Sequence, residues 1–273
     1  MANIVNLSAW AKVNLSLGIE GVKDGFHELD SVMVTVDLKD DVTITKRTDN
    51  EVNVTYLTGE KFSSDNAYKV AVAIKEKYGL SGFDVSISKG VPQGVGLGGS
   101  AVDGAGIARG LEEIFNVKTD DDFLVTLGGD IPFLKKGGCA VVKGRGELVT
   151  PVEMPEIFIF LVYGSESLST KEIFATYDKI GGKGGKSSDF LRDFVPFNAL
   201  EDSATKICPS VIKSRKVLEN AGFTHVVMTG SGSGYIAYEF DKNEFESKTE
   251  KAALLVKQEN LNSRVLKTIK ELQ

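Results

Sequence analysis

The feature that most constrains this chain is a glycine-rich segment at residues 90–106, which separates a strand pattern from a helix pattern. Residues 83–88 alternate polar and apolar side chains, as strands do, and residues 107–115 place apolar side chains on one helix face. Glycines let backbone N–H groups turn toward one point, and a helix N-terminus adds about half a positive charge. The segment therefore predicts a phosphate cradle, with a flexible linker as the plain alternative.

The residues in and around this segment show which known phosphate-binding patterns it does not match. The run Gly94–Gly99 satisfies the G-x-G-x-x-G pattern of dinucleotide folds, but the acidic residues 120–122 stand where such a fold needs a second apolar strand. No Lys follows Gly99, so the P-loop pattern is absent there, and neither H-R-D nor D-F-G of the protein kinases occurs. The segment is therefore expected to belong to another phosphate-binding class, and a dinucleotide oxidoreductase remains a weak alternative.

Periodicity in the rest of the chain predicts a mixture of strands and helices. Residues 9–19 alternate, which predicts a half-buried strand with Lys12 and Asn14 on the same face. Residues 21–25 predict a turn, and residues 181–188 predict a flexible loop. The other expected strands cover 29–36, 41–44, 51–56, 139–142, 147–149, 157–163, 225–228 and 235–240, and the other expected helices cover 66–78, 120–127, 171–178, 209–220 and 244–256.

Length and a proline-bearing stretch predict two domains. A chain of 273 residues has room for two hydrophobic cores. Residues 151–155 carry two prolines between two expected strands, which is typical of a boundary. We therefore expect an N-terminal domain over residues 1–153 and a C-terminal domain over residues 154–273.

Charge and composition exclude several function classes. The chain has 32 Lys and Arg against 38 Asp and Glu, whereas a nucleic acid or anionic membrane partner requires clustered positive charge. Two cysteines and two histidines exclude a disulfide framework and a multi-histidine metal site. The longest apolar run, residues 157–163, is too short for a membrane span. We therefore expect a cytoplasmic protein without a membrane or nucleic acid partner.

Three further stretches carry polar groups that could act on a phosphate or an alcohol. Lys12 places an ammonium in mid-strand, and Asp130 places a carboxylate among glycines and apolar residues. Residues 228–234 (MTGSGSG) offer a second row of backbone donors. Each stretch also has an ordinary structural explanation, which is a solvated strand face, a turn and a hairpin loop respectively.

In order and spacing, four stretches resemble the GHMP small-molecule kinases, a family named after galactokinase, homoserine kinase, mevalonate kinase and phosphomevalonate kinase. The stretches are AWAKVNLSLGI at 9–19, PQGVGLGGSA at 92–101, LGGDIPF at 127–133 and MTGSGSG at 228–234. The resemblance covers nearly the whole chain. It implies an α+β fold of two domains with an active-site cleft between them.

Within that family the chain looks most like the branch that phosphorylates a cytidine-diphosphate-linked methylerythritol. The deciding stretch is DGFHEL at 24–29, similar to the branch's D-G-Y-H-E. The resemblance implies ATP-dependent transfer to the 2-hydroxyl of that substrate, in the non-mevalonate route to isoprenoid precursors, with ATP and Mg²⁺ as cofactors. It implies a small nucleotide-diphosphate alcohol as the partner and a monomer or weak homodimer. The alternatives are a kinase for another small alcohol and a nucleotide-binding relative that has lost catalysis.

The resemblance also implies roles for individual residues. Lys12 and Asp130 would be the catalytic pair, in which Asp130 orients the hydroxyl or accepts its proton, and Lys12 holds that carboxylate. The implied ATP-binding residues are Asn66, Gly94, Gly96, Leu97, Gly98, Gly99 and Ser100, of which Ser100 would also contact the metal. The implied substrate-binding residues are Asn14, Phe26, His27, Gly230, Ser231 and Gly232, with Phe26 stacking on the cytosine and His27 donating or accepting a hydrogen bond.

Two positions depart from the pattern of this branch. Phe26 stands where the branch has Tyr, so stacking is kept and a hydroxyl is lost. In the glycine-rich segment, Ala101 and Val102 replace a serine pair, which removes the hydroxyl expected beside Mg²⁺ and phosphate. In the register of the wider family, G-L-G-S-S-A, Ser100 supplies that hydroxyl, and this is the register we favour.

Overall fold

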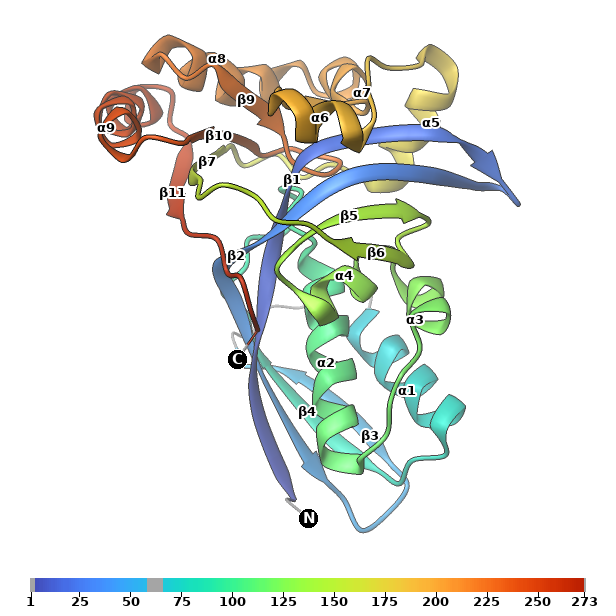
Figure 1. Cartoon of the computed structure of the whole chain (residues 1–273). Coiled ribbons are helices and arrows are strands. Elements are labelled where there is room, and N and C mark those ends of the chain that lie inside the picture. The colour runs from blue at the N-terminus through green and yellow to red at the C-terminus, as the bar shows by residue number, and fades with distance from the viewer. Residues whose placement is uncertain (1–2, 58–65, 273) are drawn as a thin grey trace.

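The computed structural model describes residues 3–57 and 66–272, within which the strands form two sheets (Figure 1). The seven-stranded sheet has the order β3 (Val52–Tyr56), β4 (Phe83–Ser88), β2 (Phe26–Lys46), β1 (Ile4–Lys23) and β8 (Phe197–Asn198) in this described part, and continues from β2 through β5 (Cys139–Gly144) to β6 (Leu148–Pro151). The four-stranded sheet, again in the described residues, has the order β11 (Asn262–Leu266), β7 (Phe158–Tyr163), β10 (Tyr235–Glu239) and β9 (His225–Met228).

Helices cover each sheet. Beside the larger sheet lie α1 (Asn66–Tyr78), α2 (Gly99–Phe115), α3 (Asp121–Leu127) and α4 (Ile131–Lys136) (Figure 1). The helices of the second half are α5 (Thr170–Ile180), α6 (Ser187–Asp193), α7 (Glu201–Ile207), the 3-10 turn η1 (Pro209–Val211), α8 (Ile212–Ala221) and α9 (Lys242–Gln258). Figure 1 shows these elements gathered at the opposite end of the molecule from the N-terminus.

The long hairpin of β1 and β2 connects the two ends of the molecule. It turns at Asp24 and Gly25, both with positive φ, so the expected turn over 21–25 is shorter than predicted because β1 continues to Lys23. Lys12 and Asn14 share a face of β1, as predicted, although β-bulges between Trp10 and Ala11 and between Asn14 and Ser16 interrupt the alternation. The expected half-buried strand is wrong. Lys12 is 2% exposed on the face that the pattern assigns to solvent, because that face lies under the glycine-rich segment and the second half of the chain.

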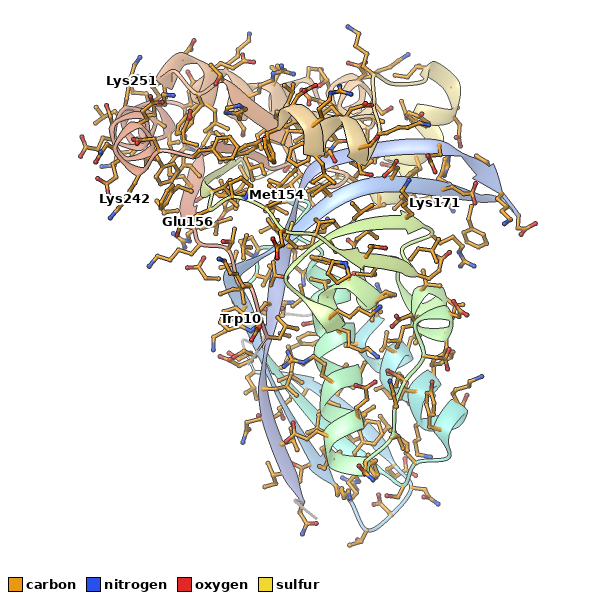
Figure 2. All side chains as sticks on the ribbon, in the orientation of Figure 1. Trp10, Met154, Glu156, Lys171, Lys242 and Lys251 are labelled. Carbon is orange, nitrogen blue, oxygen red and sulfur yellow. The ribbon has the colours of Figure 1, made fainter. Side chains whose placement is uncertain are left out.

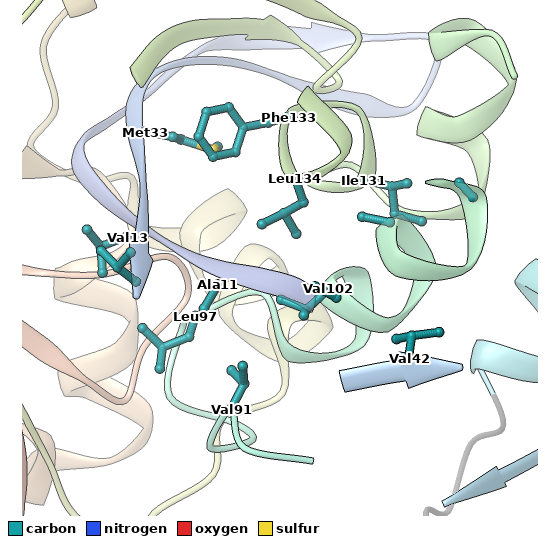
Figure 3. Packing of buried hydrophobic residues seen from close by; sticks show 14 of the residues in the cluster. Ala11, Val13, Met33, Val42, Val91, Leu97, Val102, Ile131, Phe133 and Leu134 are labelled. Carbon is teal, nitrogen blue, oxygen red and sulfur yellow. The ribbon is translucent and has the colours of Figure 1, made fainter. Parts of the chain in front are cut away.

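Helix α2 begins at Gly99, well before the residue at 107 where periodicity places it. Small residues explain the difference, since glycines that weaken an isolated helix let this one approach the sheet closely. A Cβ atom on Gly106 would lie 2.8 Å from a methyl carbon of Val42 and 2.9 Å from Cβ of Ala9. Figure 3 shows Val102 of this helix packed in the same apolar cluster.

The C-terminal end of the described chain returns to the larger sheet. The N–H of Ile269 donates to the carbonyl of Thr35 at 2.9 Å, and Val36 pairs with Thr268. One buried apolar cluster includes Ile159 of β7 together with residues of β1 and β2. The domain boundary at residue 153 remains a prediction.

Elements with a strong local pattern match the expectations. Helix α1 and strands β4 and β9 have the predicted bounds, and β7, α5, α8, β10 and α9 differ from prediction by a few residues. Strand β2 merges two expected strands into one. Short or mixed-polarity elements were missed, namely α4, α6, α7, β8 and β11. No helix in the described residues is long and apolar enough to cross a membrane.

Candidate active site

A cleft of about 880 Å³ collects residues from both halves of the chain. Side chains or backbone of fourteen residues singled out from the sequence line it: Lys12, Asn14, Phe26, His27, Asn66, Gly94, Gly96, Gly98, Gly99, Ser100, Asp130, Gly230, Ser231 and Gly232. Leu97 is the exception. Its side chain is buried in the apolar core near Ala11 and Val13 and does not reach the cleft (Figure 3).

The glycine-rich segment has the backbone that its composition predicts. Gly94, Gly96 and Gly98 have φ of 70°, 81° and 77°, a region that other residues rarely adopt. Helix α2 then starts at Gly99, and its cap residue Gly98 has no side chain that could bond the first N–H groups. Those N–H groups have no partner inside the helix and carry the positive end of its dipole. An anion in the cleft is the natural acceptor for them.

The glycine-rich turn at 229–234 holds this segment in place. The N–H groups of Ser233 and Gly234 donate to the carbonyls of Gly94 and Val95 at 3.1 and 3.3 Å. The hydroxyl of Thr229 donates to the carbonyl of Gly96 at 3.2 Å. The two glycine motifs are therefore one structural unit, and Thr229 is a supporting residue that the sequence did not single out.

The ammonium of Lys12 lines the cleft beside the glycine-rich segment. Its Nζ donates to Oδ1 of Asn14 at 2.6 Å and to the carbonyl of Gly96 at 3.1 Å. The same Nζ lies 3.4 Å from Oδ2 of Asp130. The amide of Asn14 donates to the hydroxyl of Ser31 at 2.9 Å, which fixes the orientation of its oxygen. Lys12 is thus a buried cation held by oxygens on three sides.

Asp130 stands at the N-terminal end of α4. Its carboxylate makes no cap hydrogen bond to that helix, and the side chain is 27% exposed toward the cleft. A Cβ atom on Gly98 would lie 3.6 Å from Asp130 Oδ2 and 3.4 Å from the Lys12 side chain, so Gly98 leaves the room in which these groups meet. The carboxylate is therefore accessible to a hydroxyl group placed beside the helix α2 N-terminus.

The first residues of β2 form the far end of the cleft. Phe26 is half exposed, and the guanidinium carbon of Arg145 lies 3.8 Å from its ring centroid. His27 Nε2 lies 2.7 Å from Oδ1 of Asp178, and its ring lies 4.7 Å from that of Phe174. The aromatic ring of Phe26 and the imidazole of His27 thus lie where they were expected. Phe26 contacts Arg145, and His27 contacts Asp178.

Arg145, Thr170, Lys171 and Phe174 also line the cleft, although the sequence did not identify them as site residues. Figure 2 shows Lys171 beside the end of the β1–β2 hairpin. No short motif marks these side chains, because they reach the cleft from a turn between β5 and β6 and from around the start of α5.

The two registers of the glycine-rich segment place the expected hydroxyl group at different residues, and the structure distinguishes them by exposure. Val102 is fully buried and Ala101 lines the cleft without a hydroxyl. Ser100 is exposed and lines the cleft in the first turn of α2. A hydroxyl for the cleft therefore comes from Ser100, as the favoured register requires.

A dinucleotide site has no support in the topology. After α2 the chain forms α3 and α4, whereas a dinucleotide fold needs a strand followed by an acidic residue. Residues 65–140 instead match the family model described as GHMP kinases N terminal domain.

Relatives extend this match over most of the chain. It is similar to the 4-diphosphocytidyl-2-C-methyl-D-erythritol kinase of Caldicellulosiruptor saccharolyticus, with 30% identity over 86% of this chain and 89% of the relative. The enzyme of the same name from Shouchella clausii is 30% identical over 83% of each chain.

Solved structures show the same fold. A crystal structure of 4-(cytidine 5'-diphospho)-2C-methyl-D-erythritol kinase superimposes with a TM-score of 0.76 at 23% identity, over 97% of this chain and 99% of that one. Homoserine kinase from Cytophaga hutchinsonii gives a TM-score of 0.70 at 16% identity, over 100% and 96%. The predicted α+β, two-domain GHMP-kinase fold is thereby confirmed. With relatives matched over most of its length, the chain belongs to the GHMP kinase family, in the branch of the 4-diphosphocytidyl-2-C-methyl-D-erythritol kinases.

Proposed function

We propose that this protein transfers the terminal phosphoryl group of ATP to the 2-hydroxyl of 4-diphosphocytidyl-2-C-methyl-D-erythritol, a step of non-mevalonate isoprenoid precursor biosynthesis. The observation that carries the proposal is the 3.4 Å approach of Lys12 to Asp130 beside the N-terminus of α2. The names of the relatives supply the acceptor. A cytoplasmic location and a monomeric or weakly dimeric state remain predictions.

The glycine-rich segment and the start of α2 would bind the triphosphate. Gly98, Gly99 and Ser100 line the cleft at the N-terminal end of α2, and their backbone N–H groups, at the positive end of the helix dipole, would bind phosphate oxygens. Asn66 lines the same cleft at the start of α1 and would lie toward the nucleoside. Leu97 would contribute only through its backbone.

Asp130 and Lys12 would act on the acceptor hydroxyl. Phosphoryl transfer depends mainly on positioning and charge stabilisation, so the carboxylate needs only to orient the hydroxyl or to accept its proton as the O–P bond forms. Lys12 keeps that carboxylate in place and offsets negative charge that develops at the transferring group. Asn14 aligns the ammonium through its 2.6 Å hydrogen bond.

The donor set of the cleft fits a magnesium ion that arrives with the nucleotide. Asp130 is the acidic side chain that lines the cleft among the described residues, and these contain no group of three or more His, Cys, Asp or Glu able to hold a metal. One carboxylate together with phosphate oxygens is a common Mg²⁺ environment. Asp130 and the hydroxyl of Ser100 would hold the ion, which would offset the charge of the triphosphate.

The cytidine end of the acceptor would bind at Phe26 and His27. A half-exposed ring offers a stacking face for a base, and the imidazole offers a hydrogen bond to its edge. Gly230, Ser231 and Gly232 would close the same side of the cleft, where the hydroxyl of Ser231 bonds that of Thr170 at 2.9 Å.

A kinase assay with four acceptors tests the proposal. ATP is supplied with cytidine-diphosphate methylerythritol, homoserine, mevalonate or galactose, and phosphorylated product is identified by ³¹P NMR. Product is expected from the cytidine acceptor alone, and Asp130→Asn is expected to form it at least about tenfold more slowly. Product from another acceptor would contradict the substrate. ATP binding without any product would favour a relative that has lost catalysis, for which Ala101 and Val102 supply a reason.

A further inference from the structure

Behind the glycine-rich segment lies a buried cluster of three charged side chains, Asp40, Lys89 and Asp103. They come from β2, from the residue after β4 and from the second turn of α2. The Nζ atom of Lys89 lies 2.5 Å from Asp40 Oδ2 and 2.9 Å from Asp103 Oδ1. The exposed fractions of the side chains are 0% for Asp40, 4% for Lys89 and 2% for Asp103. Neither carboxylate lines the cleft.

This charged cluster contacts the glycine-rich segment both at its first residues and at the start of α2. Oδ1 of Asp40 accepts the N–H groups of Gly90 and Val91 at 2.7 and 2.9 Å, at the entry of the segment. Lys89 Nζ lies 3.4 Å from the carbonyl of Gly99, the first residue of α2, and contacts Asp103 one turn later. The charged cluster therefore contacts the first turn of α2, whose N–H groups would bind phosphate.

The cluster contains two carboxyl groups and one ammonium. Asp40 accepts hydrogen bonds from Lys89 and from the backbone N–H groups of Gly90 and Val91. Asp103 has the same ammonium and, at 3.5 Å, the hydroxyl of Tyr56. The charged groups that act on Asp103 are the ammonium of Lys89 and the carboxylate of Asp40. A single proton on the cluster therefore belongs on Asp103.

Burial of Asp103 raises the pKa of its carboxyl group. Desolvation raises the pKa of Asp103 to about 7, with the charge of Asp40 adding to the rise and that of Lys89 opposing it. The group would then change charge in the range where enzymes of this kind operate.

We propose that Asp103 is a positioning residue of the nucleotide site, and that the site binds the triphosphate more tightly when Asp103 holds a proton. The physical reason is charge. With the proton the cluster is neutral, whereas without it a net negative charge lies behind the first turn of α2 and opposes the helix dipole. The inference rests on the proposed function, because it requires that a nucleoside triphosphate bind there.

Binding and protonation are then linked. A triphosphate that prefers the protonated cluster raises the affinity of Asp103 for its proton, so ATP binding near neutral pH takes up protons. If the bound triphosphate raises this pKa by half a unit to one unit, the KM for ATP increases about three- to sevenfold between pH 6 and pH 8.5. The kcat value reports Asp130 and the acceptor and need not follow that change.

Titration calorimetry with ATP and Mg²⁺ at pH 7.5, in two buffers of different ionisation enthalpy, measures the proton uptake. The wild type is expected to take up about 0.3 to 0.5 proton more than Asp103→Asn, and the KM of the variant is expected to lose its pH dependence. Glu113→Gln removes the same charge from an exposed position near the far end of α2 and is expected to behave as the wild type.

Two outcomes would separate this inference from the function on which it rests. A wild type that does not bind ATP would contradict both. ATP binding with equal proton uptake in the wild type and Asp103→Asn would contradict the inference alone.

A second measurement uses the unaltered protein, in case the variant does not fold. In a ¹³C NMR titration of the aspartate carboxyl carbons, one buried carboxyl is expected to titrate near pH 7 and to shift upward when ATP is added. A full set of carboxyl groups that titrate below pH 5 with and without ATP would overturn the proposal.

Discussion

Lys12 Nζ lies 3.4 Å from Asp130 Oδ2, although the two residues come from the first strand and from the start of α4. The pair is asymmetric, since the Lys12 side chain is 3% exposed and the Asp130 side chain is 27% exposed. A buried cation beside an accessible carboxylate suits a site in which the carboxylate meets the substrate and the cation stays behind it.

Replacing the carboxylate tests its role. Asp130→Asn keeps the shape of the side chain and removes its negative charge, so kcat is expected to fall by at least about one to two orders of magnitude. Steady-state kinetics with the cytidine acceptor measures the change, and thermal unfolding checks that the variant is folded. Turnover close to that of the wild type would remove Asp130 from the mechanism.

Lys12→Met removes the buried ammonium while keeping a long apolar stem. The oxygens of Asn14, Gly96 and Asp130 then lose their shared partner, and kcat is expected to fall by about 10² or more, the usual effect of removing a charge that stabilises a transition state. Lys39→Met is the matched control, because Lys39 is half exposed and pairs with Asp41. An equal loss in both variants would contradict a specific role for Lys12.

The ring of Phe26 should affect one substrate only. Phe26→Ala removes the stacking face, and the KM for the cytidine acceptor is expected to rise about tenfold, within the range of base–aromatic stacking. Phe26→Tyr should keep the wild-type value, and the KM for ATP should not change in either variant. An unchanged acceptor KM in Phe26→Ala would mean that the base binds elsewhere.

Gly96 should not accept any side chain. Its φ is 81°, and a Cβ atom would lie 1.8 Å from the carbonyl oxygen of Thr229. Gly96→Ala is therefore expected to separate the two glycine motifs and to weaken ATP binding by at least about tenfold, with a loss of stability of about 1–3 kcal/mol. In Gly21→Ala the new methyl group meets nothing within 4 Å, so calorimetry should give wild-type ATP affinity.

Asp103 should make stability depend on pH. Its pKa is about 7 in the folded state against 3.8 for an ordinary Asp. The folded protein therefore holds a proton that the unfolded chain has released, and this contribution is fully present below pH 3.8 and is lost as pH rises through 7. Relative to the wild type, Asp103→Asn should gain stability between pH 5 and 7, by up to about 1.4 kcal/mol per pH unit. Urea unfolding at several pH values measures the difference, and a constant difference would contradict the assignment.

Local periodicity correctly predicted that Lys12 and Asn14 share a strand face, because alternation depends only on neighbouring residues. It could not predict that this face is buried, since the covering segments lie far along the chain. The short helix α4 was missed for a related reason. Its six residues, Ile131–Lys136, are too few to show a helical period, and the position of Asp130 follows from packing against α2.

The approach of Asp130 to Lys12 was expected only from the resemblance to a family, and Arg145 was not expected at all. Arg145 reaches Phe26 through the pairing of β5 with β2 (Leu29 opposite Gly144), a contact between segments more than a hundred residues apart. Such contacts have no signature in one sequence. The prediction that glycines let the backbone turn at this segment agrees with the positive φ values of Gly94, Gly96 and Gly98, because glycine adopts that conformation without a steric cost.

The hydrogen bonds from Ser233 and Gly234 to Gly94 and Val95 also have a consequence for biosynthesis. A ribosome releases residues 94–98 long before it has translated residues 229–234. Until the later segment emerges, the carbonyls of Gly94 and Val95 lack these partners. The contact between the two glycine motifs therefore forms only after residues 229–234 have been synthesised, more than a hundred residues later than the segment they hold.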